Sequence, residues 1–245
     1  MSSLADPPRL PLIDFSLFDI GGTWRDQVAA QVDWAASEFG LFYVIGHGIE
    51  AGLIDSVLPL VGTNDRELRN LPDAHDAVRD YGTALTGLGH RLMTSFGRGS
   101  RLGDNFFVDR YTGNPIIRVG AYPQMHAGRE QGDDSLLTLI YQEESIGLQI
   151  QHSGAWVDVP FVPGSFVIRV GERFERLTSG RYVSAVHRLR YGTTRSGRSI
   201  GFQFDTIHTC DRVAVDRKPV SHEIAYAESD VVSKRRQLKY ASIRE

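Results

Sequence analysis

The sequence predicts an α+β fold that is mainly β: a double-stranded β-helix, or jelly roll, with a strand-helix-strand extension before it and helices at its flanks. Three observations predict this class. Short apolar strands surround an amphipathic segment within residues 10–49, a second helical period covers 76–98, and from residue 136 the apolar period becomes two. We expect one domain over residues 1–245, with an extension at 1–115, a jelly-roll core at 116–210 and a tail at 211–245.

The extension begins with a predicted strand at residues 10–15, followed by a predicted amphipathic helix. Residues 23–26, Thr-Trp-Arg-Asp, fit a capping box, and apolar side chains then recur at helical spacing as far as Phe39. Gly40 is expected to end this helix, because glycine readily adopts the left-handed conformation found at helix ends. A buried strand is predicted next, at 41–45.

The second predicted helix, at 76–98, has one apolar face. That face is formed by Leu85, Leu88, Leu92, Met93 and Phe96. The core is then predicted to form six short strands, at 136–142, 147–152, 156–161, 165–171, 182–190 and 199–205. Tight turns are expected at 152–155 and 162–165, and evenly spaced strands of this kind are typical of a double-sheet jelly roll. The tail at 229–245 is predicted to form a basic surface helix.

The composition excludes several classes of protein. A net charge of −3 and an isoelectric point near 6.2 argue against a nucleic-acid partner. The single cysteine, Cys210, excludes an internal disulfide framework and a thiolate zinc site. No apolar run reaches the roughly 18 residues of a membrane span, and the N-terminal residues do not read as a signal peptide. We therefore expect a cytoplasmic protein with no membrane partner, and the sequence predicts no particular oligomeric state.

Two polar segments carry the functional signal. Residues 129–139 read Arg-Glu-Gln-Gly-Asp-Asp-Ser-Leu-Leu-Thr-Leu, and residues 184–188 read Ser-Ala-Val-His-Arg. Together they resemble the isopenicillin N synthase-like branch of the 2-oxoglutarate/Fe(II) oxygenases, in which the first segment usually reads Glu-His-Thr-Asp-Tyr-Gly before Leu-Leu-Thr-Leu. Residues 39–49 resemble the N-terminal part of that family, in which the histidine matching His47 is structural. The resemblance extends over about residues 10–205 and implies a jelly-roll oxidoreductase.

The resemblance implies an iron site with one ligand replaced. Asp133 and His187 fall on the carboxylate and second imidazole positions, and Gln131 stands where the first imidazole is expected. Residues two apart in an extended chain point the same way, so Gln131 keeps the required direction. An amide oxygen binds Fe(II) less well than imidazole does. Either Gln131 is a weak ligand, or His126 folds back to replace it, or His126 is an ordinary loop residue.

The position for the cosubstrate is also altered. The resembled family usually carries Arg-x-Ser on a late strand, where the arginine pairs with the distal carboxylate of 2-oxoglutarate. Ser199 matches the serine, but Gly197 occupies the arginine position. Arg195 has the same strand parity as Ser199 and would reach inward if the strand extends that far. The substitution at Gly197 argues against ordinary use of 2-oxoglutarate.

An arginine is predicted inside the barrel. Within residues 165–171, the apolar side chains at 166, 168 and 170 are expected to face a core, which puts Arg169 on the opposite, interior side, where the resembled family usually has asparagine. With Arg118 and Tyr122 it would form a cationic wall for an anionic substrate. The alternative is a surface arginine paired with Glu172 or Glu175.

Three functions follow from these residues. The first is an atypical Fe(II) oxygenase or oxidase that acts on a small, anionic molecule, with Asp133, His187 and Gln131 or water at the metal. The second is a metal-independent lyase, isomerase or cyclase in which Asp133 and His187 form an acid/base pair, Gln131 orients the substrate and the pKa of His187 is raised. The third is an inactive binding module.

Overall fold

The computed structural model describes residues 9–60, 73–109, 132–144, 146–190 and 199–204, and the backbone of 116–118. Its elements, in chain order, are β1 (Leu12–Asp14), α1 (Ser16–Ile20), α2 (Gly22–Glu38), β2 (Leu41–Ile45), α3 (Ala51–Val57), the 3-10 helix η1 (Leu58–Leu60), α5 (Ala74–Gly99), β3 (Ile116–Arg118), β4 (Leu137–Gln142), β5 (Leu148–His152), β6 (Ala155–Asp158), β7 (Phe166–Val170), α6 (Glu172–Leu177), β8 (His187–Leu189) and β9 (Ser199–Phe204).

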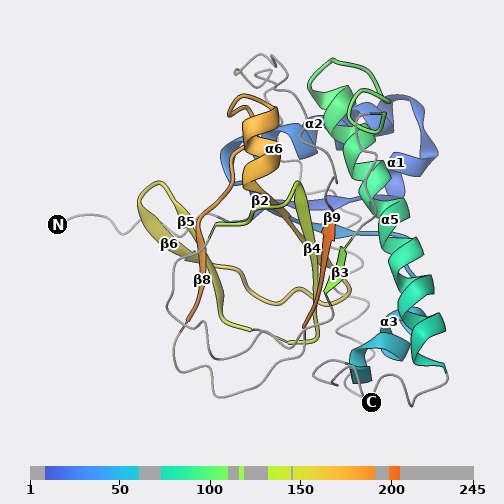
Figure 1. The fold of residues 1–245 in the computed structure, drawn as a ribbon. Coiled ribbons are helices and arrows are strands. Elements are labelled where there is room, and N and C mark those ends of the chain that lie inside the picture. Colours follow the sequence, from blue (N-terminus) through green and yellow to red (C-terminus); the bar gives the residue numbers. More distant parts are fainter. Residues whose placement is uncertain are drawn as a thin grey trace, which may run out of the picture.

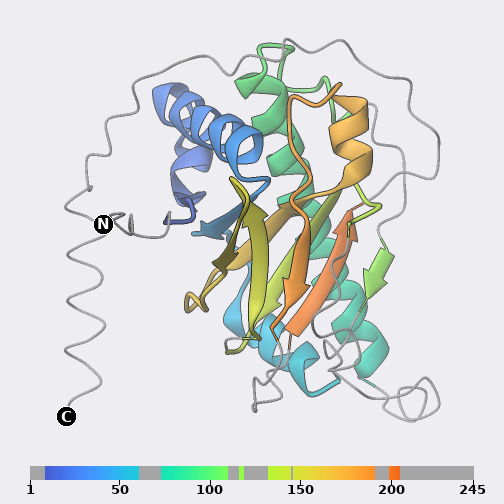
Figure 2. The same cartoon turned by 90° about the vertical axis from the view of Figure 1, so that its left-hand side faces the viewer.

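Two sheets face each other and form the barrel. Among the described residues, the larger has six strands in the order β1-β2-β7-β4-β9-β3, and the smaller has three in the order β6-β5-β8. Only the β1–β2 pair is parallel among these described strands. Figure 1 shows the small sheet on one side and α5 on the other, and Figure 2 looks onto the small sheet with the large sheet and α5 behind it. This arrangement confirms the predicted jelly-roll class.

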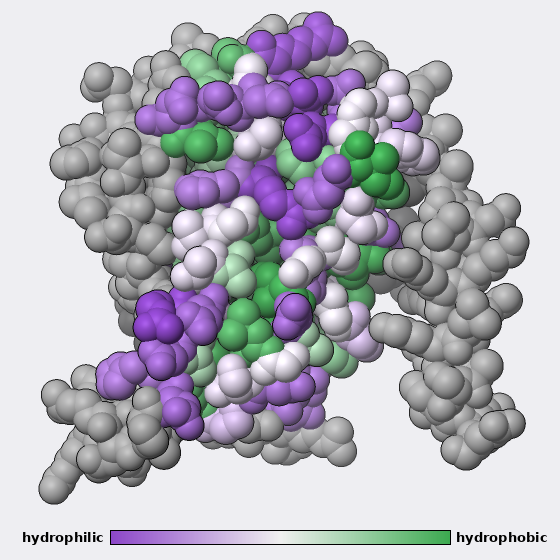
Figure 3. Space-filling view, turned by 90° about the vertical axis from the view of Figure 1, so that its right-hand side faces the viewer, coloured by the Kyte–Doolittle hydropathy of each residue, from purple (hydrophilic) through white to green (hydrophobic). Residues whose placement is uncertain are grey.

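Strand alternation divides the apolar core into two parts. In β7, Phe166, Ile168 and Val170 belong to the cluster that packs against the helices, whereas Val167 belongs to the cluster between the sheets. Arg169 has the parity of Val167 and lies with it inside the barrel, as predicted. The helix-side cluster also includes buried residues of α2, α5 and α6. Figure 3 views the side over α5 and α3, where hydrophilic side chains surround smaller apolar patches.

The N-terminal extension is part of the core sheet. β2 lies between β1 and β7 in the larger sheet. The segments on both sides of the predicted boundary near residue 115 therefore contribute strands to the same sheet. The first long helix begins at Gly22, and its N-cap is Gly21 with φ 83°, without a side-chain cap. The predicted capping box at residues 23–26 is therefore wrong, because the chain has already entered the helix there. The helix ends at Glu38 with Phe39 as its C-cap, and Gly40 follows with the positive φ, 65°, expected after a helix.

Most other predicted elements agree within two or three residues, but the strand predicted at 182–190 is only β8, at 187–189. The chain at the start of this predicted strand instead contacts α2 through a buried polar cluster. Asp33 of α2 accepts hydrogen bonds from Arg181 and from the hydroxyl of Tyr182. These contacts draw residues 181–182 toward α2, out of the reach of the small sheet. The predicted tail helix at 229–245 lies outside the described residues.

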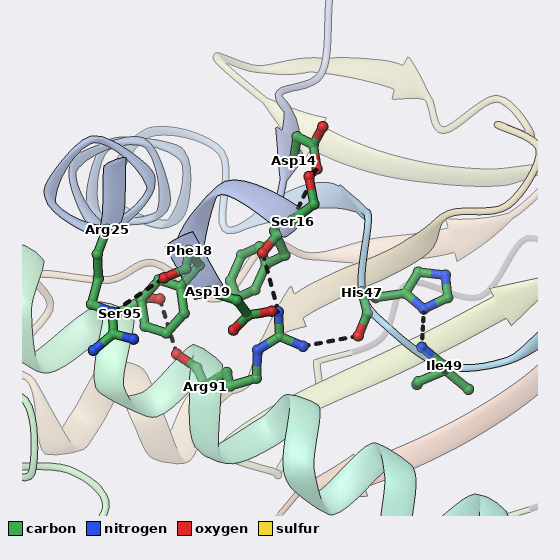
Figure 4. A network of polar contacts seen from close by, with 10 residues as sticks. Asp14, Ser16, Phe18, Asp19, Arg25, His47, Ile49, Arg91 and Ser95 are labelled. Carbon is green, nitrogen blue, oxygen red and sulfur yellow. Dashed lines mark hydrogen bonds and ion pairs between the residues drawn. The ribbon is translucent and has the colours of Figure 1, made fainter. Parts of the chain in front are cut away.

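Arg91 of α5 connects the helix to the loops around β1 and β2 (Figure 4). Its guanidinium donates to the backbone oxygens of His47 and Phe15 at 2.9 and 3.1 Å and pairs with Asp19 at 2.6 Å. Nδ1 of His47 accepts the backbone N–H of Ile49 at 3.1 Å. His47 thus belongs to the structure of this loop, on the helix side of the sheet. None of the helices in the described part of the chain combines the length and apolar character of a membrane span.

Candidate functional site

The structure describes four of the predicted site residues in full: Asp133, Arg169, His187 and Ser199. Arg118 lies in β3 opposite Gly201 of β9, and only its backbone is described. The other predicted site residues, and the two positions weighed beside them, fall outside the described residues; they are Gln131, Tyr122, Arg195, His126 and Gly197. Their roles therefore stay predictions.

A buried salt bridge joins Asp133 to Arg169. Nε and Nη2 of Arg169 donate to Oδ2 of Asp133 at 2.9 and 2.8 Å. The side chains are only 6% and 1% exposed for the arginine and the aspartate. This contact corrects the interpretation of Arg169 as a surface residue paired with Glu172 or Glu175. It also corrects the cationic wall, since a carboxylate already balances the charge of Arg169.

Two hydroxyl groups complete the surroundings of the Asp133 carboxylate. Thr138 donates to Oδ2 at 2.6 Å, and Ser135 donates to Oδ1 at 2.8 Å. Burial by itself raises the pKa of Asp133, but the charge of Arg169 and the hydrogen bonds from Thr138 and Ser135 outweigh it, so the pKa is lowered. Asp133 is therefore an anion whose two oxygens both accept hydrogen bonds within the protein.

The turn from β7 into α6 holds the Asp133 loop in place. The backbone N–H of Glu172 donates to the carbonyl of Asp133 at 2.6 Å, and that of Gly171 donates to Leu136 at 2.9 Å. A Cβ at Gly171 would lie 2.0 Å from the carbonyl oxygen of Ser135, so only glycine allows this approach. The register of β7 with β4 pairs Arg169 with Thr138. Backbone pairing thus brings Arg169, Thr138 and the Asp133 loop together.

His187 lies inside the barrel on the small sheet. It pairs with Ile150 of β5, is 5% exposed, and its Nδ1 has no hydrogen-bond partner in the described part of the chain. Burial and then the charge of Arg169 lower the pKa of His187 to about 3, against the opposing effects of Asp133 and the backbone of Ala185. The predicted rise in pKa is therefore wrong. The prediction took only the Asp133 carboxylate into account. The buried guanidinium of Arg169 neutralises that carboxylate and lowers the pKa of His187.

A second polar position lies further along β4. Gln142 pairs with Ser199 of β9, and both side chains are buried, at 3% and 0% exposure. Neither amide atom of Gln142 nor the hydroxyl of Ser199 has a hydrogen-bond partner among the described residues. Gln142 is four residues from Thr138, roughly 13 Å along the strand. Gln142 is not among the residues predicted from the sequence, although its parity with Thr138 in β4 places it inside the barrel.

The described residues do not fit a resident Fe(II) ion. No group of three histidine, cysteine, aspartate or glutamate side chains among them is arranged to hold a metal. A dication on Asp133 would also lie a few ångströms from the Arg169 guanidinium. Two unit charges 4 Å apart repel by about 4 kcal/mol at an effective dielectric constant of about 20, and a dication doubles that value. Asp133 and His187 therefore do not form a metal centre by themselves.

Comparison with known proteins gives a consistent result. The family model for the N-terminal region of the non-haem dioxygenases in morphine synthesis matches residues 10–63, and that of the 2OG-Fe(II) oxygenase superfamily matches 104–204. The chain is 24% identical over 305 aligned residues to 1-aminocyclopropane-1-carboxylate oxidase of Dictyostelium mucoroides, covering 82% of each chain. It is also 24% identical to leucoanthocyanidin dioxygenase 1 of Oryza sativa subsp. indica, covering 74% of this chain and 66% of the relative.

Solved structures share the fold. A full-length Neurospora crassa protein in complex with alpha-KG superposes with a TM-score of 0.72 at 17% identity, covering 87% of this chain and 89% of that one. A putative 2OG-Fe(II) oxygenase family protein from Caulobacter crescentus has a TM-score of 0.69 at 17% identity, covering 93% and 98%. The two matched regions, 10–63 and 104–204, contain every strand that the structure describes.

Proposed function

The chain belongs to the 2OG-Fe(II) oxygenase superfamily of oxidoreductases, and we propose that it is an atypical member that acts on a small polar molecule bound inside the barrel. The observation that carries this proposal is the register pair of Gln142 and Ser199. Their buried polar atoms lack hydrogen-bond partners in the described part of the chain. His187 contributes a fourth such atom, Nδ1, from the opposite sheet.

Buried polar groups are rarely left without hydrogen-bond partners. Each such group costs about 1–3 kcal/mol when its hydrogen bond is missing. Native proteins satisfy nearly all of them with protein atoms, ordered water or a ligand. Unpartnered groups on facing sheets of one barrel are therefore best explained by a molecule that enters between them.

The chemistry of Gln142 suggests the class of ligand group. Its side chain offers a carbonyl acceptor beside an N–H donor, and the hydroxyl of Ser199 both donates and accepts. A carboxylic acid or carboxamide edge presents the complementary pair of atoms. Recognition would rest on hydrogen bonds more than on the charge of Arg169, because Asp133 balances that charge. Arg118, Tyr122 and Arg195 remain proposed binding residues for an anionic group.

Use of 2-oxoglutarate is not part of this proposal in its usual form. Ser199 matches the serine that contacts the cosubstrate in the resembled family, but Gly197 lacks the guanidinium that would pair with its distal carboxylate. The Neurospora crassa protein has been solved in complex with alpha-KG. For this chain, binding at Ser199 and Gln142 through hydrogen bonds alone would be weaker.

The metal-independent acid/base function loses its main support. A general base works best when its pKa lies near the working pH, and the pKa of His187 is about 3. Asp133, its proposed partner, is engaged by Arg169, Thr138 and Ser135. An inactive binding module differs from an enzyme in one measurable respect, because it would bind the same class of ligand without converting it.

Binding by variants of the barrel tests this function. The wild type and Gln142→Leu and Ser199→Ala variants would be titrated with 2-oxoglutarate, succinamide and thymine, with NMR chemical shifts as the readout. We expect Gln142→Leu to weaken the binding of a carboxyl or carboxamide probe about tenfold, the loss of one buried hydrogen bond. Gln151→Leu is the control, because Gln151 is exposed on β5. Equal weakening by the control, or none by either barrel variant, would contradict the proposal.

A further inference from the structure

We propose that Arg169 takes the place of a metal ion in this barrel: its guanidinium is the resident cation of the Asp133 carboxylate and excludes divalent metals from it. The inference depends on family membership and on the described contacts, and not on the ligand proposed above. Arg169 lies inside the barrel. An uncharged side chain at this position would leave the Asp133 carboxylate without its cation and available to a metal ion.

The first step is the geometry of the pair. Two N–H groups of Arg169 converge on Oδ2 of Asp133 at 2.9 and 2.8 Å, and Thr138 adds a third donor to the same oxygen at 2.6 Å. An oxygen that accepts three hydrogen bonds has no lone pair left for a metal. Charge-assisted hydrogen bonds to a carboxylate are also about twice as strong as neutral ones. A metal would therefore have to displace these contacts to bind Oδ2. Oδ1 accepts one hydrogen bond, from Ser135 at 2.8 Å, and a dication bound to it would still lie a few ångströms from the Arg169 guanidinium.

The second step is burial. The side chains of Arg169 and Asp133 are 6% and 1% exposed, so water does not take over the hydrogen bonds of either group when the pair separates. An isolated buried charge is strongly unfavourable. A metal that captured Asp133 would leave the guanidinium buried without its counter-ion, and the two cations would repel each other across a site of low polarity. Metal binding at Asp133 would therefore carry the cost of a buried guanidinium without its counter-ion.

The third step is that Arg169 is fixed by the backbone. It lies within β7, which hydrogen-bonds with β2 on one side and β4 on the other. The register places it opposite Thr138 and Leu41, so its direction into the barrel follows from the sheet and does not depend on a loop. At the sequence level, the same chain has Gln131 where an imidazole ligand would be expected. Gln131 stands in place of an imidazole ligand, and Arg169 adds a cation that competes with a metal ion for Asp133.

The test measures metal binding directly. Wild type and an Arg169→Asn variant would be titrated with Mn(II) and with anaerobic Fe(II) by calorimetry, and the retained metal counted after desalting. We expect Arg169→Asn to bind metal at least about 100-fold more tightly than wild type, because the repulsion between the guanidinium and the dication is removed. Arg173→Asn is the matched control, since it removes the same charge from an arginine that is 40% exposed. Stoichiometric Fe(II) retained by wild type, or equal affinities in all three proteins, would overturn the proposal.

A test on the folded wild-type protein does not depend on the stability of that variant. The Nε–H of Arg169 donates to Asp133, so its NMR signal should be protected from exchange, and an Arg169→Lys variant assigns it by its disappearance. We expect this signal to keep its shift and width when Mn(II) is added. Paramagnetic broadening of the signal at a stoichiometric amount of Mn(II) would show metal on Asp133 beside an intact Arg169, and would overturn the proposal.

A double variant separates the two changes. Replacing Gln131 with histidine alone should leave metal affinity within about threefold of wild type, because Arg169 still holds Asp133. In the Arg169→Asn background, the same Gln131→His change should strengthen metal binding a further tenfold or more, of the size expected for one added imidazole ligand. If Gln131→His alone gives stoichiometric metal binding, the missing imidazole and not Arg169 controls the site, and the proposal fails.

Discussion

The described part of the chain contains two buried arginine–aspartate pairs in very different surroundings. Arg181 donates to both carboxylate oxygens of Asp33, with three contacts of 2.7 to 3.0 Å, and Arg169 makes two contacts of 2.8 and 2.9 Å to one oxygen of Asp133. Side-chain exposure is at most 6% in either pair. By distance and burial alone, the two pairs have the same chemistry.

Their neighbours distinguish them. The Asp33–Arg181 pair connects α2 to the segment before β8, and the hydroxyl of Tyr182 also donates to Asp33, at 2.8 Å. The ring of Tyr182 lies 4.8 Å from that of Phe96 and 5.3 Å from that of Phe174, within the helix-side core. The Asp133–Arg169 pair lies inside the barrel, where Ser135 and Thr138 donate to the carboxylate. The charges of the pair also act on the pKa of His187. A buried ion pair is therefore structural or functional according to what else reaches its carboxylate.

The largest expected effect is the loss of the structural pair. Asp33→Ala leaves the Arg181 guanidinium buried without a counter-ion, and breaking a buried pair in this way typically costs 3–5 kcal/mol, so we expect a loss of about 4 kcal/mol in unfolding free energy. Urea denaturation followed by circular dichroism measures this loss. Tyr182→Phe, which removes one hydrogen bond to Asp33, should cost only about 1 kcal/mol. Equal stability of Asp33→Ala and wild type would show that the pair contributes nothing.

The second prediction compares the two arginines directly. Arg169→Asn and Arg181→Asn should each lower the unfolding free energy by about 3 kcal/mol or more in chelator, because each leaves a buried carboxylate without its cation. Added Mn(II) should restore about half of the loss in Arg169→Asn, since binding to the native state stabilises it. It should restore none in Arg181→Asn, because Asp33 is enclosed by the aromatic helix-side core, whereas Asp133 faces the barrel interior that also contains His187. Recovery of both variants, or of neither, would remove the distinction between the pairs.

The third prediction concerns the polar end of the barrel. Gln142→Leu removes a buried amide without partners in the described part of the chain, so we expect stability to stay the same or rise by about 1 kcal/mol. Gln149→Leu is the control, because that amide donates to Asp158 at 2.7 Å and accepts from Arg188 at 2.9 Å, and its loss should cost about 1 kcal/mol. Thermal denaturation of both variants gives the comparison. A clear loss in Gln142→Leu would mean that its amide has a partner after all.

The smallest effect is a pH dependence outside the barrel. Burial lowers the pKa of His47, and nearby Arg91 acts in the same direction, although the backbone of Gly164 opposes them. Because the folded pKa lies below the unfolded value of about 6.5, the unfolded state binds the proton first, and stability should fall as pH decreases below that value. Urea midpoints of wild type and His47→Gln between pH 7.5 and pH 5 measure this. A pH dependence that is the same in both proteins would assign it to other groups.

The sequence by itself determined much of the fold. The apolar period of two located β4, β5, β7 and β9 within one or two residues, and parity within β7 put Arg169 inside the barrel. The motif around Asp133 and the histidine at 187 identified two positions that the structure places within electrostatic range of each other. These features are local, since strand parity and short motifs depend on neighbouring residues and not on the rest of the chain.

Only the tertiary structure decided which charges meet. Arg169 and Asp133 are 36 residues apart, and Arg181 and Asp33 are 148 residues apart, so each pairing depends on strand register or helix packing that no local period specifies. The predicted pKa of His187 had the wrong direction for the same reason, because the buried guanidinium that determines it belongs to another strand. A charge in a protein interior responds to every ionised group within several ångströms. Parity can tell which way a side chain points, but only the packed barrel determines the atoms that it meets.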